Sequence, residues 1–302
     1  MAEQFTLDVA LDSSGITQGA DTATSSLAGL TSQAGLVSGA LKTAGVAAVA
    51  FAGAQGLGAA ISAANQLQDE LSALRSEVGL NADEVGRIRS ETLDLASDTG
   101  EATQSIISGF KFARSAGLNF AESQELVETA TKGAAAGFGE QDDLVRTATT
   151  ALKAWTEEVD SGAGFLDQLA KSAQNMDIEV AGLSEAFRRN VSIASQLNLS
   201  LDETLAGLGA VAGAAGDASR GGRLFQQVLS GLLSPTEQAE ETISDVFGSI
   251  ENLRRGLEED GLIPTMVELR RRLEQSGRGM EDVFTSTRRL EGALALTADE
   301  GA

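Results

Sequence analysis

The stretch between Lys42 and Asp69 carries no ionisable side chain, and small or aliphatic residues fill most of it. It is long enough to cross a bilayer as a helix, but Ala and Gly contribute little to membrane insertion. Small residues four positions apart also allow two helices to approach closely. Residues 43–68 are therefore expected to form one apolar helix that is either buried in a bundle, which we favour, or inserted into a membrane under some conditions. Its candidate contact residues are Val46, Val49, Phe51, Leu57 and Ile61.

The chain as a whole is strongly acidic. Its formal net charge is −22 and its isoelectric point is near 4.3, which disfavours binding to nucleic acid because such binding needs a basic surface. Arg greatly outnumbers Lys, and an acidic, lysine-poor surface is typical of proteins adapted to concentrated salt, which screens the charge repulsion. Ordinary solubility charge explains the same composition, and the sequence leaves both interpretations open.

The sequence offers no group that stands out as catalytic or metal-binding. It contains neither Cys nor His, which excludes disulfides, thiolate nucleophiles, the usual zinc sites and Ser-His-Asp chemistry. The Gly-rich segment 213–223 lacks the Lys and the following Ser or Thr of a nucleotide-binding loop. No loop has calcium-binding spacing, and no pair of carboxylates is distinguished from the rest. We therefore expect no enzymatic activity, no cofactor and no metal. The acidic start of the chain does not resemble a secretory signal.

The N-terminal residues are expected to form a short strand followed by a small-residue linker or helix. Phe5, Leu7, Val9 and Leu11 alternate with less apolar residues, and a period of two is typical of a half-buried strand. Because one strand is not stable alone, it should pair with another copy or with another protein.

The middle of the chain shows the apolar period of short amphipathic helices. Their start signals recur, since Asn81, Asn119 and Ser200 each precede a Glu by three residues, which is the pattern of a reciprocal N-terminal cap. The stretch 118–137 also aligns with the stretch 197–216. This internal similarity indicates duplicated helical hairpins.

The last part of the chain begins at a proline. Pro235 follows Ser234, and we expect it to occupy the first position of a helix, where proline is well tolerated. Beyond it, pairs and triplets of Arg lie among Glu and Asp, with Leu residues at helical spacing. This pattern predicts a charged helical tail in which Arg residues pair with carboxylates more readily than with phosphates.

The sequence thus predicts a mainly α-helical fold, an elongated multi-helix assembly of short amphipathic hairpins. It adds one short N-terminal β-strand and one apolar Ala/Gly-rich helix. The expected divisions are residues 1–42 for the strand and linker, 43–68 for the apolar helix, 69–235 for the repeated hairpins and 236–302 for the charged tail.

The order of these features resembles the amino-terminal core of phage tail tape measure proteins. In that family a short strand and an Ala/Gly run precede capped short helices, and a small-residue turn then leads into a Leu-rich helix that stops at Pro. The resemblance covers most of residues 1–300 and makes 69–235 the tape-measure core. The turn of that core is matched here by Gly213, Gly216, Gly221, Gly222, Leu224 and Pro235.

The resemblance implies a structural virion protein without catalytic residues. Such a protein acts as a ruler of tail length inside the tail tube, in several copies, and leaves the tube at infection, where it assists genome passage through the envelope. The partners it implies are further copies of the chain, the major tail tube protein, tail assembly chaperones and baseplate or tail-tip proteins. It implies the tail lumen as location, with the host cytoplasm during assembly and the host membrane on infection. The alternative is a membrane-active helical protein, either a pore former or an injected effector.

Overall fold

The computed structural model describes residues 46–298, and the side chains from residue 62 onward. Within this range the chain is mainly helical and contains no strand, so the predicted helical class is confirmed for the described residues. The predicted strand at Phe5–Leu11 lies outside them. The chain divides into two compact units, residues 1–73 and 74–302. Helix α3 (Val46–Val78) begins in the first unit and ends in the second.

The apolar segment belongs to α3, but its candidate residues Val46, Val49, Phe51, Leu57 and Ile61 have side chains outside the described range. From Asp69 onward α3 carries several charged residues. Among the residues that the structure describes, no helix combines the length and the hydropathy needed to cross a bilayer. The expectation of a transmembrane helix therefore has no support in the described part of the chain.

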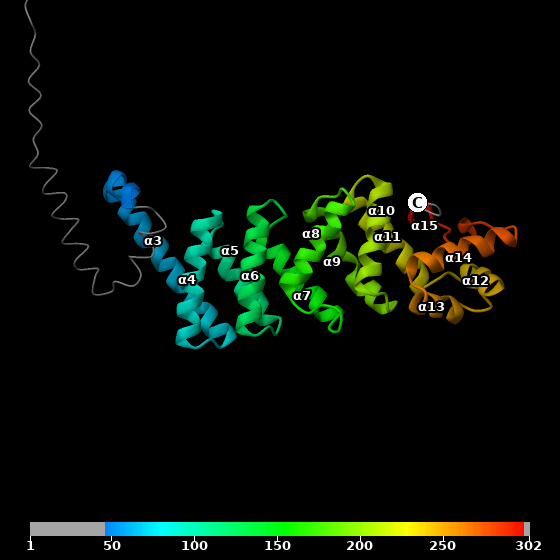
Figure 1. Cartoon of the computed structure of the whole chain (residues 1–302), viewed down its shortest axis with the longest axis horizontal. Coiled ribbons are helices and arrows are strands. Elements are labelled where there is room, and N and C mark those ends of the chain that lie inside the picture. The colour runs from blue at the N-terminus through cyan, green and yellow to red at the C-terminus, as the bar shows by residue number, and fades with distance from the viewer. Residues whose placement is uncertain (1–45, 299–302) are drawn as a thin grey trace, which may run out of the picture. The chain divides into compact units, whose positions relative to one another are not determined.

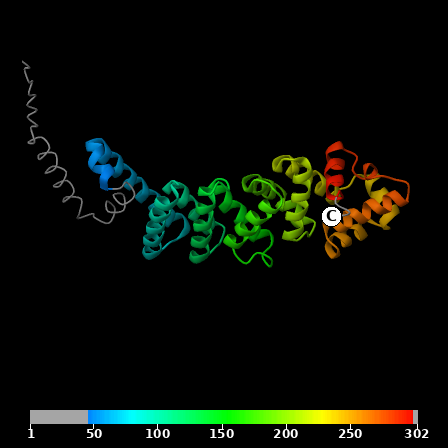
Figure 2. The same ribbon diagram turned by 45° about the horizontal axis from the view of Figure 1, so that its top comes forward.

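Eight helices of the second unit form four consecutive hairpins (Figure 1). The first helices of the hairpins contact one another along one row, and the second helices contact one another along a parallel row. Both views of the ribbon show the hairpins following one another in chain order along the second unit (Figure 2). The hairpins are α4 (Ala82–Thr99) with α5 (Thr103–Ser115), α6 (Phe120–Ala135) with α7 (Gln141–Ala154), α8 (Gly162–Asn175) with α9 (Val180–Gln196), and α10 (Leu201–Ala215) with α11 (Ala218–Leu233).

The first helix of each hairpin begins at a side-chain cap. In three of them the side chain of the cap residue accepts a hydrogen bond from the backbone N–H of a Glu three residues later. The carboxylate of that Glu accepts a hydrogen bond from the backbone N–H of the cap residue. The three cap residues are Asn81, Asn119 and Ser200. These three predicted starts are confirmed. Ser161 caps α8 in the same way, but Gly164 stands where the others have Glu, so the reciprocal bond is missing. The four caps follow one another at intervals of about 40 residues.

One buried apolar position recurs in the second helices of the hairpins. The residue seven positions after the start of α5, α9 and α11 is a Phe, at 110, 187 and 225, and it is fully buried in each helix. In α7 the same position holds Ala148. The centroid of the Phe187 ring lies 5.1 Å from that of Phe165 and 5.6 Å from that of Trp155.

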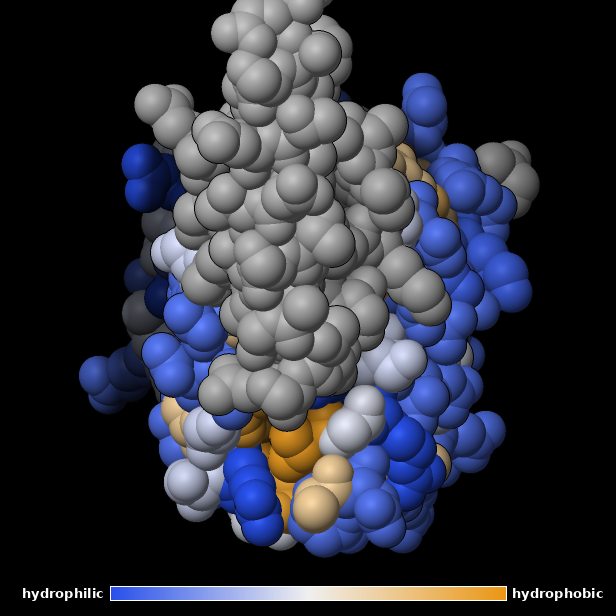
Figure 3. All heavy atoms as spheres, turned by 90° about the vertical axis from the view of Figure 1, so that its left-hand side faces the viewer, coloured by the Kyte–Doolittle hydropathy of each residue, from blue (hydrophilic) through white to orange (hydrophobic). Residues whose placement is uncertain are grey.

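The outer surface is mostly hydrophilic where its described residues face the viewer in Figure 3.

The C-terminal helices form a further cluster. Helices α12 (Glu237–Phe247), α13 (Ile250–Glu259) and α14 (Leu262–Gln275) pack on one another, and the short 3-10 helix η2 (Met280–Asp282) follows them. Helix α15 (Thr287–Leu296) returns to α10 and α11 and continues the row of second helices. This region is charged as predicted, but it also has its own core, in which Leu253, Leu257 and Leu269 are almost fully buried.

Candidate functional site: the close helix packing around α11

The Gly-rich segment forms the turn of the fourth hairpin. Gly216 ends α10 in the left-handed region, with φ of 67°, a conformation that glycine adopts without a steric penalty. Asp217 then caps α11, and its carboxylate accepts a hydrogen bond from the backbone nitrogen of Arg220 at 2.6 Å. Gly213 lies one turn earlier in α10 with open space around its Cα. The segment is thus a tight helix–helix turn.

Gly221 and Gly222 let α11 lie against two helices at once. A Cβ atom on Gly221 would come within 2.7 Å of the backbone nitrogen of Ala212 in α10. A Cβ atom on Gly222 would come within 2.7 Å of the Cβ atom of Ala186 in α9. Real Cβ atoms do not approach other atoms so closely, so any larger residue would force one of the helices to move.

A third helix packs on α11 with similarly small separation. Leu224 is buried in α11, and its backbone carbonyl would lie 3.0 Å from a Cβ atom on Gly292 of α15. Helix α11 therefore lies close to three helices, and a different glycine allows each approach. Gly222 faces α9, Gly221 faces α10, and Gly292 of α15 faces α11. The structure places Gly221, Gly222 and Leu224 in this packing centre.

A buried amide reinforces the contact between α9 and α11. The side-chain nitrogen of Asn190 donates to the carbonyl oxygens of Ala186, at 2.8 Å, and of Gly222, at 3.0 Å. Asn190 is fully buried, and its side-chain oxygen has no hydrogen-bond partner among the described residues. The amide can reach the carbonyl of Gly222 because the two helices are so close.

Pro235 lies just outside the next helix. Helix α12 begins at Glu237, and Thr236 is its N-cap, with the hydroxyl accepting from the backbone nitrogen of Ala239 at 3.3 Å. The expectation that Pro235 is the first helical residue is therefore wrong. Thr236 supplies a side-chain oxygen for the cap, which moves the start of the helix past the proline.

Polar side chains also link successive second helices at other junctions. The hydroxyl of Ser105 in α5 donates to the Gln141 side chain of α7 at 3.2 Å. The hydroxyls of Thr147 in α7 and Ser184 in α9 are 2.7 Å apart and both residues are buried. Together with Asn190, these groups provide at least one polar link at each of the three junctions from α5 to α11. Sequence reasoning missed all of them.

Hydrogen bonds also join the end of α7 and the α7–α8 connection to the start of α10, and α10 to the start of α14. The indole nitrogen of Trp155 donates to the carbonyl of Leu199 at 2.8 Å. The Glu158 carboxylate accepts from the first backbone nitrogen of α10, at Leu201, also at 2.8 Å. In the same way Glu203 accepts from the first nitrogen of α14, at Leu262, at 3.1 Å. Each of these two carboxylates thus stabilises the start of a helix that lies well beyond it in the sequence.

Comparison with known proteins identifies the family to which this chain belongs. A family model described as "Phage-related minor tail protein" matches residues 89–293, which include most of the four hairpins and the whole packing centre around α11. The chain belongs to this family.

A curated protein of similar sequence is the tape measure protein of Pneumococcus phage Dp-1. It is 24% identical to this chain over 188 residues, which are 62% of this chain and 16% of that protein. The chain thus matches about one sixth of the length of its curated relative. No solved structure matches the chain. The similarity supports the resemblance to tape measure proteins and a structural role in a phage tail.

Two carboxylates of this minor tail protein have strongly shifted pKa values. Burial, together with the nearby charges of Glu128 and Asp94, raises the pKa of Glu91 in α4 to about 7. Hydrogen bonds from Arg271 and Arg272 lower the pKa of Glu268 to about 2. In the described part of the chain, no group of acidic side chains is arranged to hold a metal ion.

Proposed function

We propose that this chain is part of a tail tape measure, a structural and non-enzymatic component that helps to set the length of a phage tail. The observation that supports this most directly is the stack of four hairpins, most of which lies within the span matched by the phage minor tail protein family. The packing centre around α11 serves to hold the stack together, and it presents backbone and apolar contacts in place of reactive groups.

The physical basis of the proposal is additivity. In a stack of repeated hairpins each hairpin mainly contacts its neighbours, so the stability and the extent of the stack are roughly sums over hairpins. A protein of this kind gains or loses length by whole hairpins while the remaining interfaces are kept. That property suits a component whose role is to span a distance.

The other roles implied by the family are part of the same proposal. Several copies would lie in the lumen of the tail tube, in contact with the major tube protein and with baseplate or tail-tip proteins, after assembly with tail chaperones in the host cytoplasm. At infection the chain would leave the tube and assist genome passage at the host membrane. A net charge of −22 would reduce adhesion to the passing DNA.

The alternative of a membrane-active protein rests on the charge-free segment 43–68. Liposome leakage separates the two proposals. Release of an encapsulated dye by the purified chain, without any tail partner, would favour the pore-forming alternative. A tail component should leave the vesicles intact.

The tail role is tested in virions. Mass spectrometry of purified tails should detect peptides from residues 74–302, and a nonsense mutation early in the gene should yield particles without tails or with tails of undefined length. Complementation from a plasmid should restore the normal length. Normal tails in the absence of the chain would refute the proposal.

A further inference from the structure

Four arginines surround a cleft between α9, α11 and α15 in this otherwise acidic chain. The cleft has a volume of about 480 Å³ and is lined by Arg189, Arg220, Arg223 and Arg288, with Glu291 as the one carboxylate in the lining. We call it the arginine cleft. Its charge stands in contrast to the net charge of −22 of the chain.

Two of these arginines already bind carboxylates and two do not. Arg189 pairs with Glu185 at 2.5 Å, and Arg220 pairs with Glu291. Among the residues that the structure describes, the Arg223 side chain donates only to the hydroxyl of Ser219, at 2.9 Å. Arg288 is exposed and makes no hydrogen bond or ion pair with any residue that the structure describes. The cleft therefore presents two guanidinium groups without a carboxylate partner, from two different helices.

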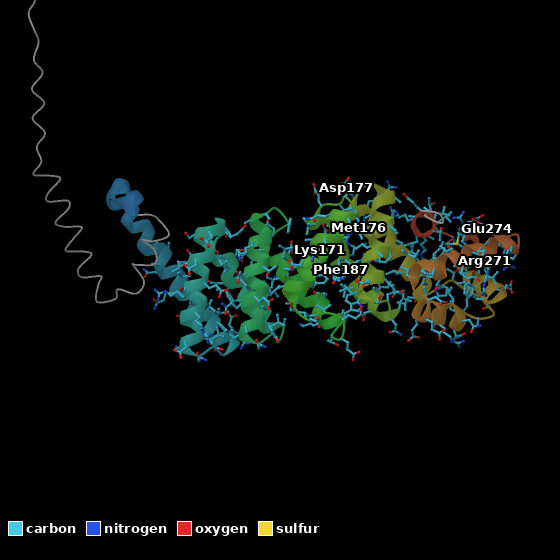
Figure 4. The ribbon with its side chains drawn as sticks, in the orientation of Figure 1. Lys171, Met176, Asp177, Phe187, Arg271 and Glu274 are labelled. Atoms are coloured by element: carbon cyan, nitrogen blue, oxygen red, sulfur yellow. The ribbon has the colours of Figure 1, made fainter. Side chains whose placement is uncertain are left out.

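A second group of arginines behaves differently. Arg271 and Arg272 both bind Glu268, and Arg270 binds Glu274 at 3.0 Å. Figure 4 labels Arg271 and Glu274 on α14. Each of these three arginines of α14 is thus paired with a carboxylate of its own helix. Arg223 and Arg288 lack such neighbours, which leaves their charge available to a partner.

We propose that the arginine cleft is a docking site for an acidic α-helix of another protein. The planar guanidinium group binds a carboxylate through two parallel hydrogen bonds, so Arg223 and Arg288 can each hold one carboxylate of the partner. Carboxylates three or four positions apart on a helix lie on one face, about 5–6 Å from each other. The half-buried amides of Gln226 and Gln227 line the same cleft and add hydrogen-bond donors.

Carboxylates fit this site better than a nucleic-acid backbone does. Glu185 and Glu291 lie beside the arginines and would repel a continuous row of phosphates, which carries one charge per nucleotide. The acidic remainder of the chain would repel a long polyanion as well. A short helix with separated carboxylates avoids both costs, because each of its charges can be placed next to an arginine. The inference does not depend on the tail role.

The test measures binding of a labelled peptide to the full chain by fluorescence anisotropy. The probe is an alanine-rich peptide of about 16 residues, long enough to form a helix, with glutamates four positions apart. We expect saturable binding that weakens as salt is added. The double variant R223A/R288A should bind about tenfold more weakly or worse. The variant R223K/R288K keeps the positive charge but loses the planar guanidinium group that makes two parallel hydrogen bonds. Its affinity for the peptide should lie between that of the natural chain and that of R223A/R288A.

The matched control is K153A/K171A, which removes the same amount of charge from exposed lysines of α7–α8 outside the cleft; Figure 4 labels Lys171. This variant should bind the peptide as the natural chain does. The proposal is overturned if the control loses as much affinity as R223A/R288A, if a peptide with glutamine in place of glutamate binds equally well, or if the natural chain does not bind the probe. Tighter binding of a single-stranded oligonucleotide, lost in the same arginine variant, would also overturn it in favour of a phosphate site.

Discussion

Removing one hairpin is the perturbation that most directly tests how this chain could measure length. Deletion of residues 162–200 takes out α8 and α9 and joins Ser161 directly to Leu201. Ser161, which caps α8, then stands in the place of Ser200, which caps α10. The first helix after the junction keeps a serine cap, and the flanking hairpins can pack on each other. We expect the shortened protein to remain folded.

The size of the effect follows from the packing. Packed helices have axes about 8–10 Å apart, so one hairpin added to a stack advances it by about 10 Å. The same residues in one continuous helix would span about 58 Å, at a rise of about 1.5 Å per residue. A tail set by stacked hairpins should therefore shorten by about 10 Å, and a tail set by an opened helix by nearly six times as much. The larger deletion of residues 120–200, which joins Asn119 to Leu201, should roughly double either value.

The assay is the mean tail length from electron micrographs of phage that carry each deletion. Circular dichroism of the purified chains checks that both deletion proteins are still helical. A phage with a substitution that leaves the chain length unchanged, such as Gly213→Ala, is the control. Tails of normal length from both deletions, with the shortened proteins present in the particles, would refute the ruler reasoning.

Three substitutions test the packing and the electrostatics of the hairpins. Gly221→Ala should destabilise the chain by about 2 kcal/mol in urea denaturation, because its Cβ would overlap the α10 backbone at Ala212. Glu91→Gln should stabilise it at pH 8 by about 1 kcal/mol, a value reduced for the partial exposure of this carboxyl. The folded chain holds the Glu91 proton up to a pKa of about 7 and the unfolded chain loses it near 4.5, so stability falls as pH rises between these values and the gain should vanish below pH 4.5. Thr147→Val leaves the Ser184 hydroxyl buried without its partner and should cost about 1–2 kcal/mol in the same assay.

Each substitution has a control that distinguishes its cause. Gly213→Ala, in the same hairpin but in open space, should stabilise α10 by up to about 1 kcal/mol. Glu125→Gln, at an exposed site on α6, should change the free energy of unfolding by the same small amount at pH 5 and at pH 8. Adding Ser184→Ala to Thr147→Val should recover part of the loss, since neither hydroxyl is then left unpaired. A loss from Gly213→Ala as large as that from Gly221→Ala would contradict the close-packing argument.

The features that were predictable from the sequence are those that depend on a few neighbouring residues. The caps at Asn81, Asn119 and Ser200 need only a polar residue and a Glu three positions later, so they can be recognised from the sequence alone. Ser161 was missed because Gly164 replaces that Glu. The start of α12 was misplaced because the proline and the Thr236 hydroxyl compete as local signals.

The features that were not predictable depend on how hairpins stack. The bond from Trp155 to the carbonyl of Leu199 joins residues far apart in the sequence, and no local pattern specifies it. The same holds for Thr147 with Ser184 and for the return of α15 to α11. The Gly221–Gly222 pair was recognised as part of a turn, but the sequence does not reveal that the two glycines face different helices.

The carboxylates that cap later helices have a consequence for the order of folding. Glu158 and Glu203 bind the first amide of α10 and of α14, so the start of each of these helices gains this bond only when an earlier part of the chain is in place. A chain emerging from the ribosome presents its hairpins in that same order. Synthesis and folding can therefore proceed in one direction, with segments made earlier supplying the hydrogen-bond acceptors that complete the starts of α10 and α14.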